Sequence, residues 1–209
     1  MRPAVPLGVP VGAGLSVAAA LLLTGLATDG SGSGSGSGSG AGAAAATRTV
    51  AAAPAAAAAV AAPRARPSAP ALTGKDLDGR PVSLSSLRGE VVVLSVWGSR
   101  CAPCGADADD LALLSGQLRG ERVRFLGINT RDRDRDAARS FVRAHGLGFP
   151  SLHDPTGALL RRFPPLVLNP QTIPSTLVLD RRGRVAVAIG GAVSAEELRP
   201  LVARVVAEG

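Results

Sequence analysis

The sequence predicts an α/β fold for residues 71–209, in which a central mixed β-sheet is flanked by helices. Runs of β-branched residues typical of buried strands alternate with helical patterns along this part of the chain. A strand pair joined by a tight turn follows, and a capped helix closes the sequence. Strands that alternate with helices in this way are typical of a sheet packed between covering layers.

The first 28 residues predict export from the cytoplasm. Arg2 is followed by 26 uncharged residues, of which Leu15 to Leu23 are the most apolar. A positive start followed by such a run is typical of a signal peptide, here with cleavage after Ala27. An uncleaved membrane anchor is the alternative, because the 19 residues from Val9 to Ala27 are just long enough to cross a bilayer. Either way, we expect the domain outside the cytoplasm, secreted or membrane-anchored.

Residues 29–70 predict a disordered linker. Gly and Ser alternate strictly from Gly30 to Gly40, and an Ala- and Pro-rich stretch follows as far as Pro70. Chains of this composition lack the apolar side chains that a packed core needs. We therefore expect an exported N-terminal region, a linker, and a domain at 71–209 that contacts the membrane only through the N-terminal segment.

The elements of the domain follow in order. Asp78-Gly79 predicts a tight turn between two short strands that form an N-terminal β-hairpin extension. A buried strand is predicted over 91–97, and further strands over 123–128, 176–180 and 185–189. A helix is predicted from near Cys101 to about Arg119, with Leu111, Leu113, Leu114 and Leu118 on its apolar face, and another over 137–145. The last helix begins with a capping box at Ser194 to Glu197.

Composition excludes several function classes. The net charge is +7, but residues 71–209 carry 19 basic against 15 acidic groups, and aromatic residues make up only 2% of the chain. This mixture is typical of a solvated surface, so we expect no nucleic-acid partner. The Arg/Asp alternation from Arg131 to Asp136 is interpreted as a solvated helix start. His145 and His153 are isolated in the sequence, and we expect no metal site.

The chemistry is expected at residues 97–104, Trp-Gly-Ser-Arg-Cys-Ala-Pro-Cys, where the first buried strand meets the first long helix. A cysteine at a helix start meets unpaired N–H groups and partial positive charge, which favour the thiolate. Arg100 adds a full positive charge beside Cys101. With two residues between the cysteines, Cys101 would attack a partner's disulfide and Cys104 would resolve the mixed disulfide. A static disulfide or half a metal site is the alternative.

The sequence resembles the thioredoxin superfamily and, within it, the extracytoplasmic thiol–disulfide oxidoreductases of the TlpA/ResA type, over about residues 71–206. The resemblance rests on Asp78-Gly79 with Val82-Ser83-Leu84, on Leu87-Arg88-Gly89, on the motif from Trp97 to Cys104, on Phe149-Pro150 with Asp154-Pro155, and on Thr172-Ile173-Pro174-Ser175-Thr176. It implies a thioredoxin-like fold and an enzyme with no cofactor beyond a redox-active Cys101–Cys104 disulfide.

The resemblance also implies roles for single residues. Pro174 is expected in the cis form facing the cysteine pair, which leaves the Ile173 backbone free to pair with an extended substrate. The substrate-binding residues are then Trp97, Arg100, Pro103, Ile173 and Pro174. Relatives often carry an aromatic residue where Arg100 stands, and a Glu where Asp107 stands. Asp107 is therefore a candidate proton acceptor for Cys104, or a plain first-turn carboxylate.

Three functions stay open from the sequence. By resemblance, the first is a reductant of exported dithiol proteins such as apocytochrome c, with a membrane electron donor of the CcdA type. The second is an oxidant that makes disulfides in exported proteins, a direction that Arg100 favours by stabilising the thiolate. The third is a Cu(I)-binding module that uses both thiolates.

Overall fold

The computed structural model describes residues 59–209, so the predicted signal peptide or anchor and most of the predicted linker lie outside the described residues. The strands are β1 (Thr73–Lys75), β2 (Pro81–Ser83), β3 (Val91–Trp97), β4 (Val123–Thr130), β5 (Ser151–Asp154), β6 (Ser175–Leu179) and β7 (Val185–Gly190). The helices are α1 (Ala102–Gln117), α2 (Arg135–Ala144) and α3 (Ala195–Ala207), with short 3-10 turns η1 (Pro63–Ala65), η2 (Leu84–Leu87) and η3 (Leu160–Arg162). No helix of residues 59–209 is both long and apolar enough to span a membrane.

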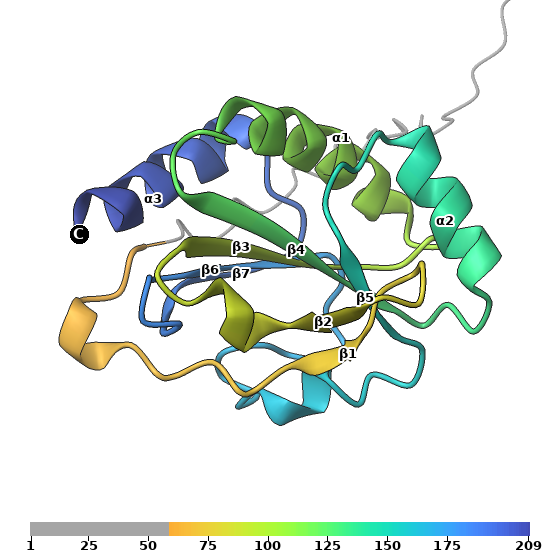
Figure 1. Ribbon diagram of the computed structural model, residues 1–209, viewed down its shortest axis with the longest axis horizontal. Helices are drawn as coiled ribbons and strands as arrows, with labels where there is room; N and C mark the ends of the chain where they lie inside the picture. Colours follow the sequence, from red (N-terminus) through yellow and green to blue (C-terminus); the bar gives the residue numbers. More distant parts are fainter. Residues whose placement is uncertain (1–58) are drawn as a thin grey trace, which may run out of the picture. The chain divides into compact units, whose positions relative to one another are not determined.

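Five strands form one mixed sheet in the order β5-β4-β3-β6-β7, and β1 pairs with β2 in a separate hairpin. β3 runs parallel to β4, β4 parallel to β5, and β6 antiparallel to both β3 and β7. Figure 1 shows α1 and α3 on one face of this sheet and the hairpin with η3 on the other. The predicted α/β class and the mixed sheet are therefore confirmed.

The central strand β3 supplies both sides of the core, because successive side chains of a strand point to opposite faces. Val92, Leu94 and Val96 pack into the cluster under the hairpin and η3. Val91 and Val93 pack into the cluster under α1 and α3. All seven residues of β3 are buried, as the unbroken β-branched run predicts.

One prediction about a side chain fails and one strand is not predicted, each for an identifiable reason. Leu113 is 56% exposed, although it was expected on the apolar face of α1. Leu111, Leu114 and Leu118 are buried and follow the helical spacing, whereas a residue two positions after Leu111 falls on the opposite side. The strand β5 is not predicted, since its four residues include no β-branched or aromatic side chain.

The packed chain begins before residue 71, the predicted start of the domain. Val185 donates a backbone hydrogen bond to Pro67 (2.8 Å), and Ala69 donates one to Gly183 (3.0 Å). The buried Arg66 guanidinium pairs with Asp180 (3.3 Å) and Glu208 (2.5 Å). Two of these contacts are made by the backbone and two by the single side chain of Arg66, so the Ala- and Pro-rich composition gave no sign of them.

Arg66 and Arg184 together stabilise the charged form of Asp180. Burial alone would raise the pKa of Asp180, but hydrogen bonds from the backbone and side chain of Arg184 and from Arg66 outweigh burial. The pKa of Asp180 is therefore held below its ordinary value, and this carboxylate stabilises the fold until the pH falls through that lowered pKa.

Replacing Arg66 with Ala should lower the free energy of unfolding by about 3 kcal/mol, because it leaves one buried carboxylate short of a partner. Urea unfolding at neutral pH measures the change. Arg80→Ala is the control, since the Arg80–Asp78 pair is exposed at both side chains, and its effect should stay within about 0.5 kcal/mol. Equal effects of the two substitutions would contradict the anchoring role of Arg66.

Candidate active site

The two cysteines lie where β3 ends and α1 begins. Cys101 is the N-cap residue of α1, and Cys104 lies in the first turn of that helix. Their sulfur atoms form a disulfide, with the Cα atoms 5.3 Å apart. Cys104 is only 1% exposed, whereas Cys101 is half-buried. An approaching sulfur therefore reaches Cys101 more readily than Cys104.

A groove of about 410 Å³ opens beside Cys101. Its lining residues come from three segments and are Gly98, Arg100, Cys101, Pro103, Thr130, Arg131, Asp132 and Ile173. Topology brings these segments together: β3 and β4 end at the same edge of the sheet because they are parallel, and the antiparallel β6 starts there. In α/β sheets, ligands commonly bind at this carboxyl edge of the parallel strands.

Several sequence-predicted residues meet in this groove. Arg100 and Pro103 flank Cys101, and Ile173 forms part of the lining from the opposite segment. The Ile173–Pro174 peptide bond is cis. Within residues 59–209, no backbone hydrogen bond is made to Ile173, whereas the Pro174 carbonyl accepts one from Gly191 (2.9 Å). The Ile173 backbone is thus available to an extended peptide.

Trp97 does not lie in the groove, which corrects its expected place on the substrate-binding surface. It is 3% exposed. Its ring stacks on Phe141 of α2 with centroids 4.7 Å apart, and its Nε1 donates to Ser151 Oγ (3.3 Å). Trp97 is therefore held by core packing beneath the cysteines, through its contacts with α2 and β5.

Asp107 lies one helical turn after Cys104 and is buried. Its Oδ1 accepts a hydrogen bond from the Val193 backbone (2.5 Å), while its buried Oδ2 accepts none from residues 59–209. The pKa of Asp107 is raised to about 6, mainly by burial. The hydrogen bond from Val193 lowers this pKa, and the nearby charge of Asp110 raises it by a smaller amount. Asp107 and Cys104 both line a narrow internal void.

The sequence interpretation is wrong for Asp132, which is not part of a solvated helix start. Asp132 is 5% exposed. It accepts hydrogen bonds from the backbone and hydroxyl of Ser99, two residues before Cys101, at 2.8 and 2.7 Å. Its place two residues after a buried parallel strand could have indicated this, because that strand ends beside the cysteine motif.

The two histidines serve as structural contacts. His145 Nδ1 lies 2.8 Å from Asp109 Oδ1 and so connects the end of α2 to α1. His153 lies between Arg135 and the backbone carbonyl of Asp132. No cluster of three or more metal-binding side chains occurs among residues 59–209.

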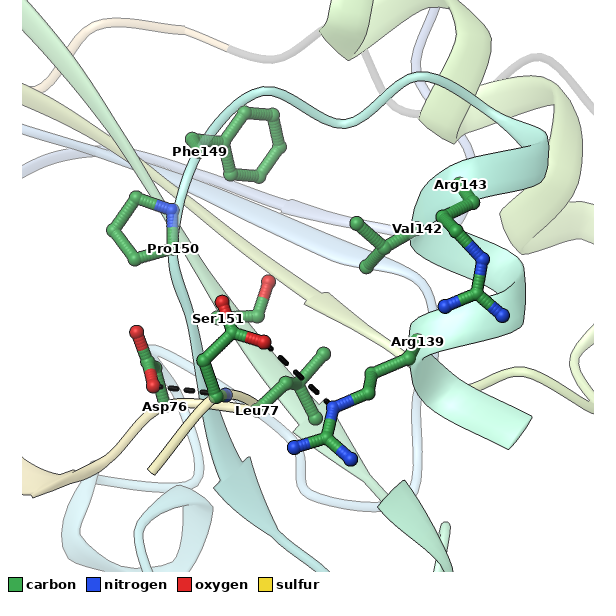
Figure 2. Close-up of a pocket in the computed structure, with 9 residues that line it drawn as sticks. Asp76, Leu77, Arg139, Val142, Arg143, Phe149, Pro150 and Ser151 are labelled. Atoms are coloured by element: carbon green, nitrogen blue, oxygen red, sulfur yellow. Dashed lines mark hydrogen bonds and ion pairs between the residues drawn. The ribbon is translucent and has the colours of Figure 1, made fainter. Parts of the chain in front are cut away.

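A second hollow lies between the hairpin, α2 and the start of β5, and Figure 2 shows Arg139 reaching from α2 toward the hairpin. Arg139 Nε is 3.7 Å from Asp78. Neither cysteine lines this hollow. The groove beside Cys101 is therefore the better candidate for the functional site.

Comparisons with known proteins agree with this assignment. A model of the AhpC/TSA family matches residues 66–188. The thiol-disulfide oxidoreductase ResA of Bacillus thuringiensis subsp. konkukian is 25% identical over 137 residues, which cover 66% of this chain and 76% of that protein. A secreted thiol-disulfide isomerase from Corynebacterium glutamicum is 32% identical with a TM-score of 0.63, and the match covers 72% of this chain and 92% of that chain. A DsbF homologue from Corynebacterium diphtheriae is 32% identical with a TM-score of 0.61, covering 71% of this chain and 92% of that chain.

The raised pKa of Asp107 predicts a pH-dependent stability for the oxidised protein. Between the ordinary value of 3.8 and about 6, the folded state holds a proton that the unfolded state has lost, so stability falls as the pH rises through this window. A shift of this size corresponds to about 3 kcal/mol. Asp107→Asn should remove this fall in stability. Between pH 4 and pH 7, the free energy of unfolding of Asp107→Asn should therefore rise by about 3 kcal/mol relative to that of the wild type. Parallel pH profiles of the two proteins in urea unfolding would contradict the assignment.

Proposed function

Because the chain belongs to the AhpC/TSA family, we propose that it exchanges disulfides with exported proteins through Cys101 and Cys104, as a reductant outside the cytoplasm. Its fold is thioredoxin-like, and the chain is a thiol–disulfide oxidoreductase of the ResA/DsbE type. The observation that carries the proposed mechanism is the asymmetry of the pair: Cys101 is accessible at the start of α1, and Cys104 is buried behind it.

The reaction begins with the reduced pair. The Cys101 thiolate attacks one sulfur of a client disulfide, so that a Cys101–client bond forms, the client S–S bond breaks and one client thiolate leaves. Cys104 then attacks Cys101 Sγ and releases the second client thiolate. The client gains two electrons as a dithiol, and the protein is left with the Cys101–Cys104 disulfide that the structure contains.

Asp107 would take the proton that Cys104 must lose before its attack. A carboxyl with a pKa of about 6 is much closer in proton affinity to a thiol, near 8.5, than an ordinary aspartate is. Both groups line the same narrow internal void, which has no room for a water molecule. This supports a proton-accepting role over a plain first-turn carboxylate.

We propose that the groove binds the client as an extended segment along Ile173, with Arg100 and Pro103 beside the attacked sulfur. Apocytochrome c is a candidate client, and a CcdA-type membrane protein is a candidate electron donor that restores the dithiol. Location outside the cytoplasm is supported by the apolar N-terminal sequence and by the secreted relative of Corynebacterium glutamicum.

Arg100 supports the second candidate, a disulfide-forming oxidant. Its exposed guanidinium lies at the groove next to Cys101. A neighbouring positive charge lowers the pKa of a thiol and stabilises the reduced form, which makes the disulfide a stronger oxidant. The two directions use the same sulfur atoms and differ only in the equilibrium of the pair.

Substituting each cysteine separately should distinguish attacking from resolving sulfur. Cys104→Ser should accumulate a mixed disulfide between Cys101 and a disulfide-bonded peptide, since the resolving step is lost, whereas Cys101→Ser should accumulate little. Non-reducing mass spectrometry measures both adducts. Stronger trapping by Cys101→Ser would reverse the assignment.

The reduction potential of the pair should decide the direction of electron flow. Equilibration of the protein with glutathione buffers is expected to give a value near that of thioredoxin, about −270 mV. A value near that of DsbA, about −120 mV, would reject the reductant and favour the oxidant. Arg100→Ala should move the potential to a more negative value, because the thiolate loses a stabilising charge.

A further inference from the structure

The segment of residues 129–132, which comprises the end of β4 and the two residues beyond it, contacts both loops that line the groove. The Asp132 carboxylate contacts the loop between β3 and α1 that carries Cys101, and both of its oxygens accept hydrogen bonds. Oδ2 accepts from the Ser99 backbone (2.8 Å) and from Asn129 Nδ2 (2.6 Å), and Oδ1 accepts from Ser99 Oγ (2.7 Å). A buried carboxylate with three donors at these distances has a fixed orientation.

Asp132 is itself held from the side of β5. The carbonyl oxygen of Asp132 lies 2.9 Å from His153 Nε2, and Arg135 Nε donates to His153 Nδ1 at 3.2 Å. With Nδ1 as acceptor, the neutral ring carries its proton on Nε2 and donates it to the carbonyl. The backbone of Asp132 is thus connected to β5 through a histidine in one defined tautomer.

Arg131 connects the same segment to the loop before Pro174. Its Nη2 donates to the carbonyls of Pro170 and Gln171 at 3.3 and 3.0 Å. Arg131 has a φ of 65°, a left-handed conformation that a residue with a Cβ seldom adopts. This turn directs the side chains of Arg131 and Asp132 to different loops.

The approach of the two backbones is also close. A Cβ atom on Gly98 would lie 2.9 Å from the carbonyl oxygen of Thr130. Only glycine at this position lets the cysteine loop lie against the segment so closely. Three neighbouring residues of the segment therefore touch the two walls of the groove.

We propose that Asp132 and Arg131 are positioning residues, with Asp132 fixing the loop that carries Cys101 and Arg131 fixing the loop that carries Ile173 and Pro174. The inference rests on the proposed exchange reaction and adds to it the residues that set the attack geometry. Thiol–disulfide exchange requires the attacking sulfur to approach along the client S–S bond, so a displaced loop slows the reaction even when the thiolate is fully formed.

The first test compares Asp132→Asn with Asp180→Asn. A carboxamide accepts at only one oxygen, so Asp132→Asn loses at least one of the hydrogen bonds to Ser99 or Asn129. Asp180 is a matched control, because it is also buried, follows a strand and accepts backbone hydrogen bonds, from Arg182 and Arg184. The readouts are the thermal midpoint, the rate of exchange with a peptide disulfide, and the rate of alkylation by iodoacetamide, at a pH where Cys101 is fully ionised.

Asp132→Asn should slow peptide exchange about 10- to 100-fold, while alkylation, which tolerates many approach directions, stays within about twofold. Asp180→Asn should lower the thermal midpoint and leave both rates unchanged. Equal effects of the two variants on exchange, or a parallel fall of exchange and alkylation in Asp132→Asn, would overturn the inference. If Asp132→Asn does not fold, Ser99→Ala takes its place, because it removes only the hydroxyl donor. Ser99→Ala should slow peptide exchange and leave the rate of alkylation unchanged. An unchanged rate of exchange in this variant would overturn the inference.

The second test separates positioning by Arg131 from simple charge attraction. Arg131→Ala should raise KM for an uncharged peptide disulfide and leave kcat unchanged, because the wall that binds the peptide is released. Arg133→Ala removes the same charge from a nearby exposed residue and should leave both constants unchanged. Equal KM changes in the two variants would reject the role of Arg131. Failure of the wild type to exchange with any peptide would instead reject the proposed function.

Discussion

Parallel pairing of β3 with β4 is the constraint on which the site depends. The pairing runs from Val91 opposite Val123 to Trp97 opposite Asn129, so both strands end at the same level. The chain that leaves β3 carries the cysteines, and the chain that leaves β4 carries Asp132. A shift of one residue in this register would turn Trp97 away from α2 and separate Asp132 from Ser99. The apolar packing of β3 on both faces therefore determines the geometry of the chemistry at its end.

Two buried aspartates lie near the cysteines, and their partners give them different roles. The carboxylate of Asp132 accepts three hydrogen bonds and holds a loop in place. Asp107 accepts one, from Val193, and its second oxygen faces the interior without a partner among residues 59–209. Burial with few donors penalises the charged form, which raises the pKa of Asp107 and fits the proton transfer proposed for it.

Sequence reasoning found the parts of the site that local pattern encodes. The strand ending at Trp97, the helix starting at Cys101 and the capping box at Ser194 are all set by neighbouring residues, and the structure contains each of them. It missed Asp132 because an alternating Arg/Asp run has the composition of a solvated surface, whereas burial of that carboxylate depends on Ser99, 33 residues away. Leu113 was placed wrongly, although the helical spacing of Leu111, Leu114 and Leu118 already puts it on the opposite side of α1. The short strand β5 was missed because its residues carry no strand pattern, so that it depends on its pairing with β4.

The burial of Cys104 bears on both directions of electron flow. Since Cys104 is 1% exposed, the proposed reaction has every client or donor meet Cys101 first, with Cys104 acting only as an intramolecular nucleophile. The reductant and the oxidant therefore share one path, and the direction is set by the relative stability of dithiol and disulfide. In the reduced protein, the start of α1 and Arg100 would stabilise a Cys101 thiolate, which would favour the dithiol. A negative charge on the buried Asp107 would oppose a thiolate at Cys104, and this favours the disulfide. In the proposed reaction, the balance of these opposed charges, rather than the fold, would set which way electrons move.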